Sequence, residues 1–441
     1  MRFIDKVRKL KSTVIQYPII PVFHMSHVKD PSLAEQGRLN LEIAEKRMEA
    51  LMKVRERFAK EKPFSGLTIG MALHITKETG MLVKTLRDGG AKVAITGCNP
   101  LSTQDDVAAA LAEEENVLVW GYKGESNEDY YKFLTAVIET EPDITIDDGC
   151  DLVTEIHTKH PHLLEKMLGG CEETTTGIIR LHAMLKEGVL KTPMVAVNDN
   201  KTKHLMDNYY GTGQSTLDGI IRSTNLLIAG KTVVIAGYGS CGKGLAMRAK
   251  GMGAQVVVTE VANFPALQAA MDGHRVLPMA DAAPIGDLFV TVTGDLHVIR
   301  MEHVNKMKDG AVIANSGHFD NEIDMEALET QAKRKRRVRH YLDEYMLSNG
   351  NVVYVAGEGR LVNLASAEGH PSEVMSLSFC GQALACEYLV KNKGKLPNQV
   401  VTLPAEIDDE IARLQLDAMG LNIDELTPEQ VKYLASWQEG T

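Results

Sequence analysis

The chain has 441 residues, of which 44% are hydrophobic and 24% charged, and its formal net charge is −11. A chain of this length is too long for one ordinary hydrophobic core, so two or three globular domains are expected. The acidic balance disfavours a nucleic-acid partner, and no stretch approaches the roughly 18 consecutive apolar residues of a membrane span. Six cysteines without a C-x-x-C pair predict reduced thiols in a cytoplasmic protein.

Residues 1–24 resemble a signal peptide only in outline. A basic stretch at 6–11 precedes an apolar run at 17–23, but Pro18 and Pro21 interrupt a run that is already too short. We interpret 1–24 as an N-terminal extension.

The first half of the chain predicts alternating strands and helices. Asp30 followed by Pro31 predicts the start of one long helix, which Pro63 ends. The strand-like runs that follow are 67–73, 93–96, 117–120, 144–146 and 194–197. The helical stretches between them include 77–87, 107–115 and 129–139. This alternation predicts a parallel α/β sheet over roughly residues 60–200.

Polar residues follow four of these strands at the point where each strand ends. They are His74 with Thr76, Cys98 with Asn99, Asp147 with Asp148, and Asn198 with Asp199. Open parallel sheets bind ligands at the carboxyl ends of their strands, so these residues predict one pocket. The alternative is that they are ordinary polar residues of loops.

A second sheet is predicted from Thr232 onward, and its first turn carries the strongest motif. The β-branched run 232–236 leads into Gly237, Gly239 and Gly242, and a second strand ends on Glu260. This spacing is typical of a dinucleotide site, with the phosphates at the helix start and the acid on the adenosine ribose, which favours NAD over NADP. A structural turn is the alternative. Further strands are expected at 276–277, 288–292, 311–314 and 352–356, a helix at 372–390, and a helical tail at 404–441 in which Pro428 starts the last helix.

Two other polar stretches could bind a ligand. Residues 172–177 read Glu-Glu-Thr-Thr-Thr-Gly, more acids and hydroxyls than a helix cap needs. Lys203 and Asp207 are four residues apart and would share one face of a helix, although a surface ion pair explains that spacing equally well. The basic run 334–339 is interpreted as a solvated connector.

From about Val28 to its end, the chain resembles the S-adenosyl-L-homocysteine hydrolase (adenosylhomocysteinase) family. The motifs that carry the resemblance are, in order, Leu73-His-Ile-Thr-Lys-Glu-Thr, Gly97-Cys-Asn-Pro-Leu-Ser-Thr-Gln-Asp, Asp147-Asp-Gly, Glu172-Glu-Thr-Thr-Thr-Gly, Val197-Asn-Asp with Lys203 and Asp207-Asn, Gly237-Tyr-Gly with Gly242-Lys-Gly, Asn315-Ser-Gly-His-Phe-Asp, Gly359-Arg-Leu-Val-Asn-Leu and Gly369-His-Pro-Ser.

The resemblance implies reversible hydrolysis of S-adenosyl-L-homocysteine to adenosine and L-homocysteine with tightly bound NAD+. In the family, oxidation of the 3′-hydroxyl acidifies the C4′ proton, homocysteine is eliminated, water adds at C5′ and the hydride returns. Alternatives are an S-inosyl-L-homocysteine hydrolase, a non-catalytic NAD-binding regulatory homologue, and an ordinary dehydrogenase that releases NADH.

The resemblance also implies roles for single residues. Lys203 and Asp207 would act at the 3′-hydroxyl, with Lys203 as base and Asn208 positioning it. Asp148 would take the C4′ proton, and His74 would protonate the leaving thiolate and activate water. Substrate contacts would further involve Thr76, Glu78, Glu173, His318 and His370. Cofactor contacts would involve Thr174, Thr175, Thr176, Asn208, Asn315 and Asn363, beside Gly237, Gly239, Gly242 and Glu260. Glu78 would accept a hydrogen bond from the adenine amine, which favours adenosyl over inosyl substrates.

The sequence departs from the family pattern in three places. Ala262 and Asn263 stand where members usually have aspartate and proline, and Thr212 stands where many have cysteine. The end of the chain lacks the lysine-and-tyrosine tail with which many members cover a neighbouring subunit's cofactor. These differences bear on NAD affinity and on assembly.

The predicted architecture is two doubly wound parallel-sheet domains and a helical tail. A substrate-binding domain takes 25–210, completed by 372–416, a Rossmann NAD-binding domain takes 214–370, and 417–441 form the tail. Crossings near 210 and 370 would form a hinge whose closure excludes water. The resemblance implies a homotetramer, and the spacing of histidines and cysteines predicts no metal site.

Overall fold

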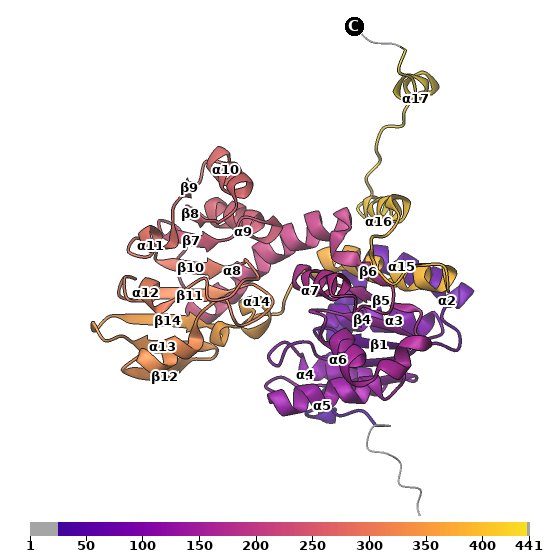
Figure 1. Cartoon of the computed structure of the whole chain (residues 1–441), viewed down its shortest axis with the longest axis horizontal. Coiled ribbons are helices and arrows are strands. Elements are labelled where there is room, and N and C mark those ends of the chain that lie inside the picture. Colours follow the sequence, from indigo (N-terminus) through magenta and orange to yellow (C-terminus); the bar gives the residue numbers. More distant parts are fainter. Residues whose placement is uncertain (1–24, 439–441) are drawn as a thin grey trace, which may run out of the picture.

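The computed structural model describes residues 25–438, so the extension predicted at 1–24 and the last three residues lie outside the described part. Two α/β lobes lie side by side, one built on a seven-stranded and one on an eight-stranded sheet (Figure 1). We call them the seven-stranded and the eight-stranded domain. Within residues 25–438, no helix has the length and apolarity needed to cross a membrane.

The seven-stranded sheet is parallel throughout, in the order β15-β6-β5-β4-β1-β2-β3. Its strands are β1 (Thr68–Ala72), β2 (Lys92–Thr96), β3 (Val117–Trp120), β4 (Ile144–Asp147), β5 (Gly169–Glu172), β6 (Met194–Ala196) and β15 (Val400–Val401). Strands β1, β2, β3, β4 and β6 confirm the five predicted strands, with bounds that agree to within two residues. Strand β5 escaped prediction because its sequence, Gly-Gly-Cys-Glu, contains neither β-branched nor aromatic residues.

Helices cover both faces of this sheet, as a doubly wound fold requires. One face packs on α1 (Ala34–Arg47), α2 (Glu49–Glu61), α3 (Lys77–Asp88), α4 (Asp105–Ala112), α15 (Ser372–Lys391) and α16 (Ala405–Ala418). The other packs on α5 (Asn127–Ile138), α6 (Asp151–Lys159) and α7 (Thr175–Lys186). The single long helix predicted after Asp30 is wrong: a short 3-10 turn (Pro31–Leu33) precedes two helices that are broken at Met48, whose φ of −108° and ψ of 46° are not helical.

The eight-stranded sheet has the order β12-β13-β14-β11-β10-β7-β8-β9. Six strands are parallel: β7 (Thr232–Ala236), β8 (Gln255–Thr259), β9 (Arg275–Val276), β10 (Leu288–Thr291), β11 (Ala311–Asn315) and β14 (Val352–Ala356). The helices of this domain are α8 (Thr212–Thr224), α9 (Ser240–Gly251), α10 (Asn263–Met271), α11 (Met279–Ala282), α12 (Met301–Val304), α13 (Met325–Gln331) and α14 (Val362–Ala365).

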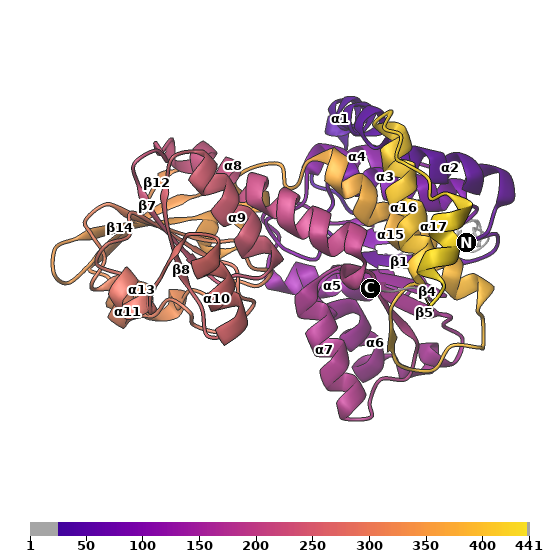
Figure 2. The ribbon, with the colours of Figure 1, turned by 90° about the horizontal axis from the view of Figure 1, so that it is seen from above.

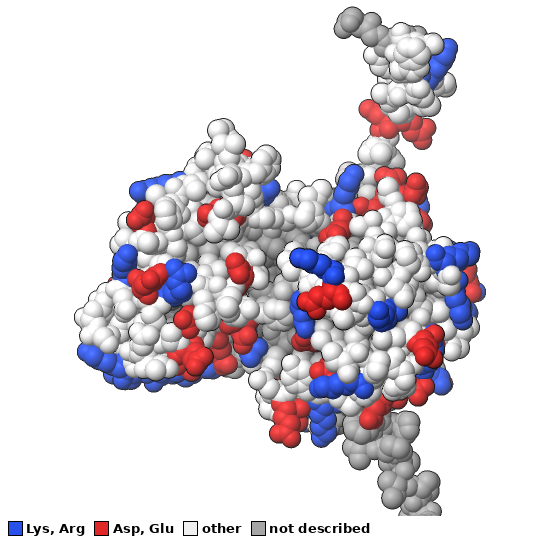
Figure 3. Space-filling model, in the orientation of Figure 1, with Lys and Arg blue, Asp and Glu red and all other residues white. Residues whose placement is uncertain are grey.

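An antiparallel hairpin, β12 (Arg334–Arg339) and β13 (Leu342–Met346), forms one edge of this sheet and corrects the interpretation of 334–339 as a connector. All six residues of β12 are exposed, so both faces of this strand can carry Lys and Arg side chains. On the neighbouring strand β13, Asp343 and Glu344 are buried. Arg336 pairs with Glu344, and Arg337 with Asp343, across the strands. In Figure 3, Lys and Arg side chains line the lower edge of the left lobe, where Figure 1 places β12.

The chain crosses between the domains twice. A π-helix, η5 (Lys203–Gly211), continues into α8 and runs between the lobes, and the segment 366–371 leads back into α15 (Figure 2). Because β15 pairs with β6, the C-terminal part completes the seven-stranded sheet. The last helix, α17 (Pro428–Leu434), stands apart from both lobes in Figure 1.

Candidate active site

A cavity of about 910 Å³ lies between the two domains and is lined by both. It contacts the carboxyl ends of β1, β4 and β5, the face of η5, and the glycine turn after β7. All site residues predicted from the sequence line it except Gly242 and Asn315. Of the strand-end residues predicted to form one pocket, His74, Thr76 and Asp148 line this cavity, and the glycine turn shares it. The others do not line it: Cys98, Asn99, Asp147, Asn198 and Asp199.

Lys203 is the centre of a buried polar group on η5. Its Nζ lies 2.8 Å from Asn208 Oδ1, 3.0 Å from Asp207 Oδ2 and 3.3 Å from Glu173 Oε1. In a π-helix the hydrogen bonds run from residue i to i+5, so residues i+4 and i+5 both return to the face of Lys203. The i, i+4 spacing of Lys203 and Asp207, which would also fit a surface ion pair, therefore forms a buried ion pair.

The charges around Lys203 fix its protonation state in the free protein. Burial lowers the pKa of its ammonium group, but the carboxylates of Asp207 and Glu173 outweigh burial and hold that pKa above its ordinary value. Burial raises the pKa of the Asp207 carboxyl, but Lys203 and His370 outweigh it and hold that pKa below its ordinary range. The pair is therefore an ammonium and a carboxylate at neutral pH.

Residues distant in sequence extend this group. His370 Nδ1 bonds Asp207 Oδ1, and its Nε2 lies 3.3 Å from Thr212 Oγ1. Glu173 accepts hydrogen bonds from Ser378 and Gln382, both at 2.5 Å. Sequence reasoning missed Ser378 and Gln382, although their i, i+4 spacing on the predicted helix after 372 places them on one face.

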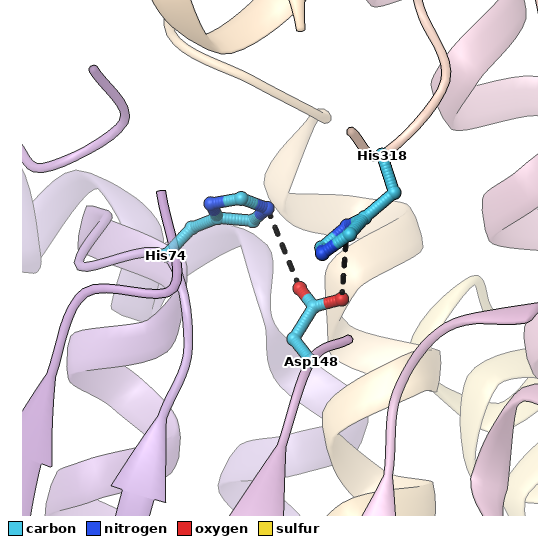
Figure 4. A group of neighbouring side chains, drawn as sticks. All are labelled: His74, Asp148 and His318. Atoms are coloured by element: carbon cyan, nitrogen blue, oxygen red, sulfur yellow. Dashed lines mark ion pairs between the residues drawn. The ribbon is translucent and has the colours of Figure 1, made fainter. Parts of the chain in front are cut away.

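A second group surrounds Asp148, at the end of β4. His74 Nε2 lies 3.4 Å from Asp148 Oδ2, and His318 Nδ1 lies 3.5 Å from Asp148 Oδ1 (Figure 4). Burial lowers the pKa of His74 to about 4, so its imidazole is neutral at pH 7. Folding brings three possible metal-ligand atoms of these residues within 4.8 Å of one another, a juxtaposition that the sequence spacing does not indicate. The proximity equally suits proton exchange between the carboxylate and an imidazole.

The far end of the pocket carries Thr76 and Glu78 on the first turn of α3. Thr76 caps this helix by accepting the Thr79 N–H. Glu78 is buried, and its Oε1 accepts a hydrogen bond from Ser372 at 2.6 Å. Lys77 Nζ lies 3.3 Å from Glu78 Oε1 but does not line the cavity.

The glycine turn is built for close approach of a ligand to the backbone. A Cβ on Gly242 would overlap the carbonyl oxygen of Gly237, so this glycine serves the packing of α9 against β7. A Cβ on Gly239 would meet nothing within 4 Å, which leaves its side of the turn open to the cavity. Glu260 accepts the backbone N–H groups of Tyr238, Val261 and Ala262 and still lines the cavity.

Three threonines and Asn363 complete the wall. Thr174, which precedes α7, and Thr175 and Thr176 in its first turn line the same cavity as the glycine turn. Asn363 lines it; this side chain is buried, its Nδ2 donates to Ser215 Oγ at 3.1 Å, and its Oδ1 has no hydrogen-bond partner within residues 25–438. The side chain of Asn315, which was predicted to contact the cofactor, lies outside the cavity: its Oδ1 accepts from Thr291 and Gly317, and its Nδ2 donates to Gly317 and Phe319. It shapes the loop that carries His318.

Comparisons with known proteins identify the family to which this chain belongs. Residues 25–160 match the sequence profile of the family "S-adenosyl-L-homocysteine hydrolase", and residues 208–369 match that of its "NAD binding domain". The adenosylhomocysteinase of Aquifex aeolicus is 58% identical over 414 residues, covering 94% of this chain and 99% of that protein. The S-inosyl-L-homocysteine hydrolase of Methanocaldococcus jannaschii is 59% identical over 417 residues, covering 95% of this chain and 100% of that protein.

Among solved structures, NAD+-bound 3-phosphoglycerate dehydrogenase of Entamoeba histolytica is 13% identical with a TM-score of 0.44, covering 77% of this chain and all of that one. The family relationship rests on the much higher identities above. By its sequence over nearly its whole length, this chain belongs to the S-adenosyl-L-homocysteine hydrolase family, with that family's NAD-binding domain at residues 208–369.

Proposed function

We propose that this enzyme reversibly hydrolyses S-adenosyl-L-homocysteine to adenosine and L-homocysteine, with NAD+ as a catalytic group that is not consumed. Residues 25–210 with 372–416 would bind the substrate, and residues 214–370 the cofactor. The observation that carries the proposal is the buried Lys203–Asp207–Glu173 group in the same cavity as the open glycine turn.

The residues present fit NAD+ at the glycine turn. Gly239 leaves room beside the start of α9, where backbone N–H groups favour phosphates, and Asn363 lines the same cavity. When bound, NAD+ supplies a reversible hydride acceptor for the carbon that bears the 3′-hydroxyl.

Lys203 and its neighbours would handle the 3′-hydroxyl proton. Because Lys203 is an ammonium in the free protein, it can act as base only after its own proton leaves. Asp207, 3.0 Å from Nζ, and His370, bonded to the other oxygen of Asp207, provide a route for that proton. Asn208 holds the amine in place through its Oδ1.

Asp148 and His74 would act at C4′ and C5′. Asp148 is the carboxylate placed to take the C4′ proton, and the neutral imidazole of His74 is placed to pass a proton to the leaving sulfur and to activate water in the second half of the reaction. His318 would contact the substrate from the cofactor side, and closure at the two crossings would exclude water.

An adenosyl substrate is favoured over an inosyl one by the end of the pocket at α3. The Glu78 carboxylate faces the cavity and is an acceptor, which suits the adenine amine; the cationic Lys77, which would suit a carbonyl oxygen, does not line the cavity. Competition between the two substrates tests this choice, with Glu78→Gln expected to reduce the adenosyl preference about tenfold or more. A wild-type preference for the inosyl substrate would refute it.

We further propose a cytoplasmic homotetramer. The C-terminal segment exposes Ile423, Leu434 and Trp437 to 74%, 68% and 90%, and α10 exposes Phe264 and Met271 to 76% each. Such apolar surfaces support association with another chain. All six cysteines are free thiols, which supports a reducing compartment.

The decisive experiment combines native mass spectrometry of the purified protein with product analysis. The proposal predicts co-purified NAD, and thiol and adenosine released from substrate without stoichiometric NADH. Bound NAD without any thiol would instead favour a regulatory homologue, and stoichiometric NADH release would favour an ordinary dehydrogenase.

A further inference from the structure

The hydroxyl group of Ser102 touches the ring nitrogen of His74 that faces away from Asp148. Ser102 lies in the loop after β2, is buried, and its Oγ is 2.8 Å from His74 Nδ1. The same Oγ is 3.0 Å from the backbone oxygen of Asn99. Nothing in the family resemblance gives Ser102 a role.

These two contacts determine where the protons lie. A carbonyl oxygen only accepts hydrogen bonds, so the contact with Asn99 requires that the Ser102 hydroxyl donate to it. The hydroxyl has one proton, so toward His74 its oxygen can only accept, and Nδ1 must carry the hydrogen. The opposite arrangement would leave two lone pairs facing each other at the Asn99 contact.

The neighbouring thiol of Cys98 does not change this placement of the hydrogen on His74 Nδ1. Cys98 Sγ lies 3.2 Å from His74 Nδ1 and 3.8 Å from Asp148 Oδ2. A thiol is a weak donor and a weak acceptor compared with the hydroxyl at 2.8 Å, and its S–H has the Asp148 carboxylate as an alternative acceptor. The titratable groups around the ring are Cys98, Asp148, Lys203, His318 and His370.

We propose that Ser102 is a positioning residue that holds His74 as its Nδ1–H tautomer and thereby presents Nε2 as the proton-exchanging nitrogen toward Asp148. The inference rests on the proposed function. The proton that Asp148 removes from C4′ passes to Nε2 and then to the sulfur as the C5′–S bond breaks; addition of water at C5′ runs the same path in reverse. Once Asp148 carries the C4′ proton, it can pass that proton only to an unprotonated Nε2, which the other tautomer, with its hydrogen on Nε2, does not offer.

The test is a double-mutant cycle with two readouts on the NAD-loaded enzyme. Ser102→Ala, His74→Asn and the double variant are assayed for thiol release from S-adenosyl-L-homocysteine. They are also assayed for the absorbance of reduced cofactor after mixing with adenosine, which reports oxidation at C3′ and does not use His74. Ser102→Thr restores the hydroxyl, and Cys98→Ala removes another neighbour of the same ring nitrogen. Ser102→Cys replaces Ser102→Ala in the cycle if the alanine variant does not fold.

The proposal predicts that Ser102→Ala slows thiol release about 10- to 100-fold, the range found when a metal-binding histidine loses the partner that orients its ring. It predicts no further loss in the His74→Asn background, oxidation within about twofold of wild type, substantial rescue by Ser102→Thr, and little effect of Cys98→Ala. Additive losses in the double variant, or equal losses in both readouts, would show that Ser102 only braces its loop. Absence of thiol release from the wild-type enzyme would instead overturn the proposed function, and the Ser102 role with it.

Discussion

Asp148, at the end of β4 in the seven-stranded domain, lies 3.5 Å from Nδ1 of His318, which the eight-stranded domain contributes (Figure 4). His74 lies on the other side of the same carboxylate, at 3.4 Å. The two domains therefore meet at the carboxylate that we assign to the C4′ proton, and their approach assembles the site.

Replacing His318 by Ala should reduce kcat/KM about 10- to 100-fold, because the imidazole that lies 3.5 Å from the buried Asp148 carboxyl group is lost. Steady-state thiol release measures this. His340→Ala, an exposed histidine at the turn between β12 and β13, is the control and should behave as wild type. An unchanged kcat/KM for His318→Ala would show that the contact has no part in the reaction.

Lys203 can be tested for charge and proton transfer separately. In both Lys203→Met and Lys203→Arg, the rate at which reduced NAD appears after addition of adenosine should fall about 10²- to 10⁴-fold. Methionine has no basic group, and arginine keeps the charge but does not give up its proton. Lys201→Met, at an exposed neighbour, should leave the signal unchanged. If Lys203→Arg retained the signal, the amine would act through its charge alone.

Two glycines of the turn should respond differently to the same added methyl group. Gly242→Ala should destabilise the protein by about 1–3 kcal/mol, because the new Cβ overlaps the Gly237 carbonyl. Gly239→Ala meets no neighbouring protein atom and should fold normally but retain less NAD. Thermal unfolding and mass spectrometry of bound NAD distinguish the two variants. Normal NAD content in folded Gly239→Ala would contradict the proposal that this turn binds the NAD+ phosphates.

Glu125 should make stability depend on pH. Burial raises the pKa of its carboxyl to about 8, from 4.5. Between these values the folded chain binds a proton that the unfolded chain does not, so the free energy of unfolding should fall as pH rises from 4.5 to 8, by up to about 4 kcal/mol. Glu125→Gln should remove this slope and be more stable than wild type at pH 8.5 but not at pH 5, as measured by urea unfolding at both pH values. Glu139→Gln, at an exposed position, is the control, and a wild-type slope in Glu125→Gln would assign the effect to other groups.

Much of the fold was predictable because local sequence specifies it. The β-branched runs around Gly237 and Glu260 mark two buried strands, and the tight turn between them needs glycine whatever the rest of the chain does. Strand-end residues such as Asp148 and His74 converge because parallel strands end at one edge of a sheet. Strand β5 and the break at Met48 escaped prediction, since a Gly-rich strand and an uncapped helix end are stabilised by packing rather than by propensity.

Only the tertiary structure decided the electrostatics of the site. A sequence alone does not determine whether burial lowers the pKa of Lys203 more than Asp207 raises it. The fold adds the Glu173 carboxylate to that of Asp207, and together they outweigh burial. The partners of these groups, Ser378, His370 and His318, come from distant segments that no local pattern connects to them. Residue types and spacings limited the chemistry that this chain could perform, whereas protonation states and tautomers depend on distances of a few ångströms, which exist only once the two sheets have packed together.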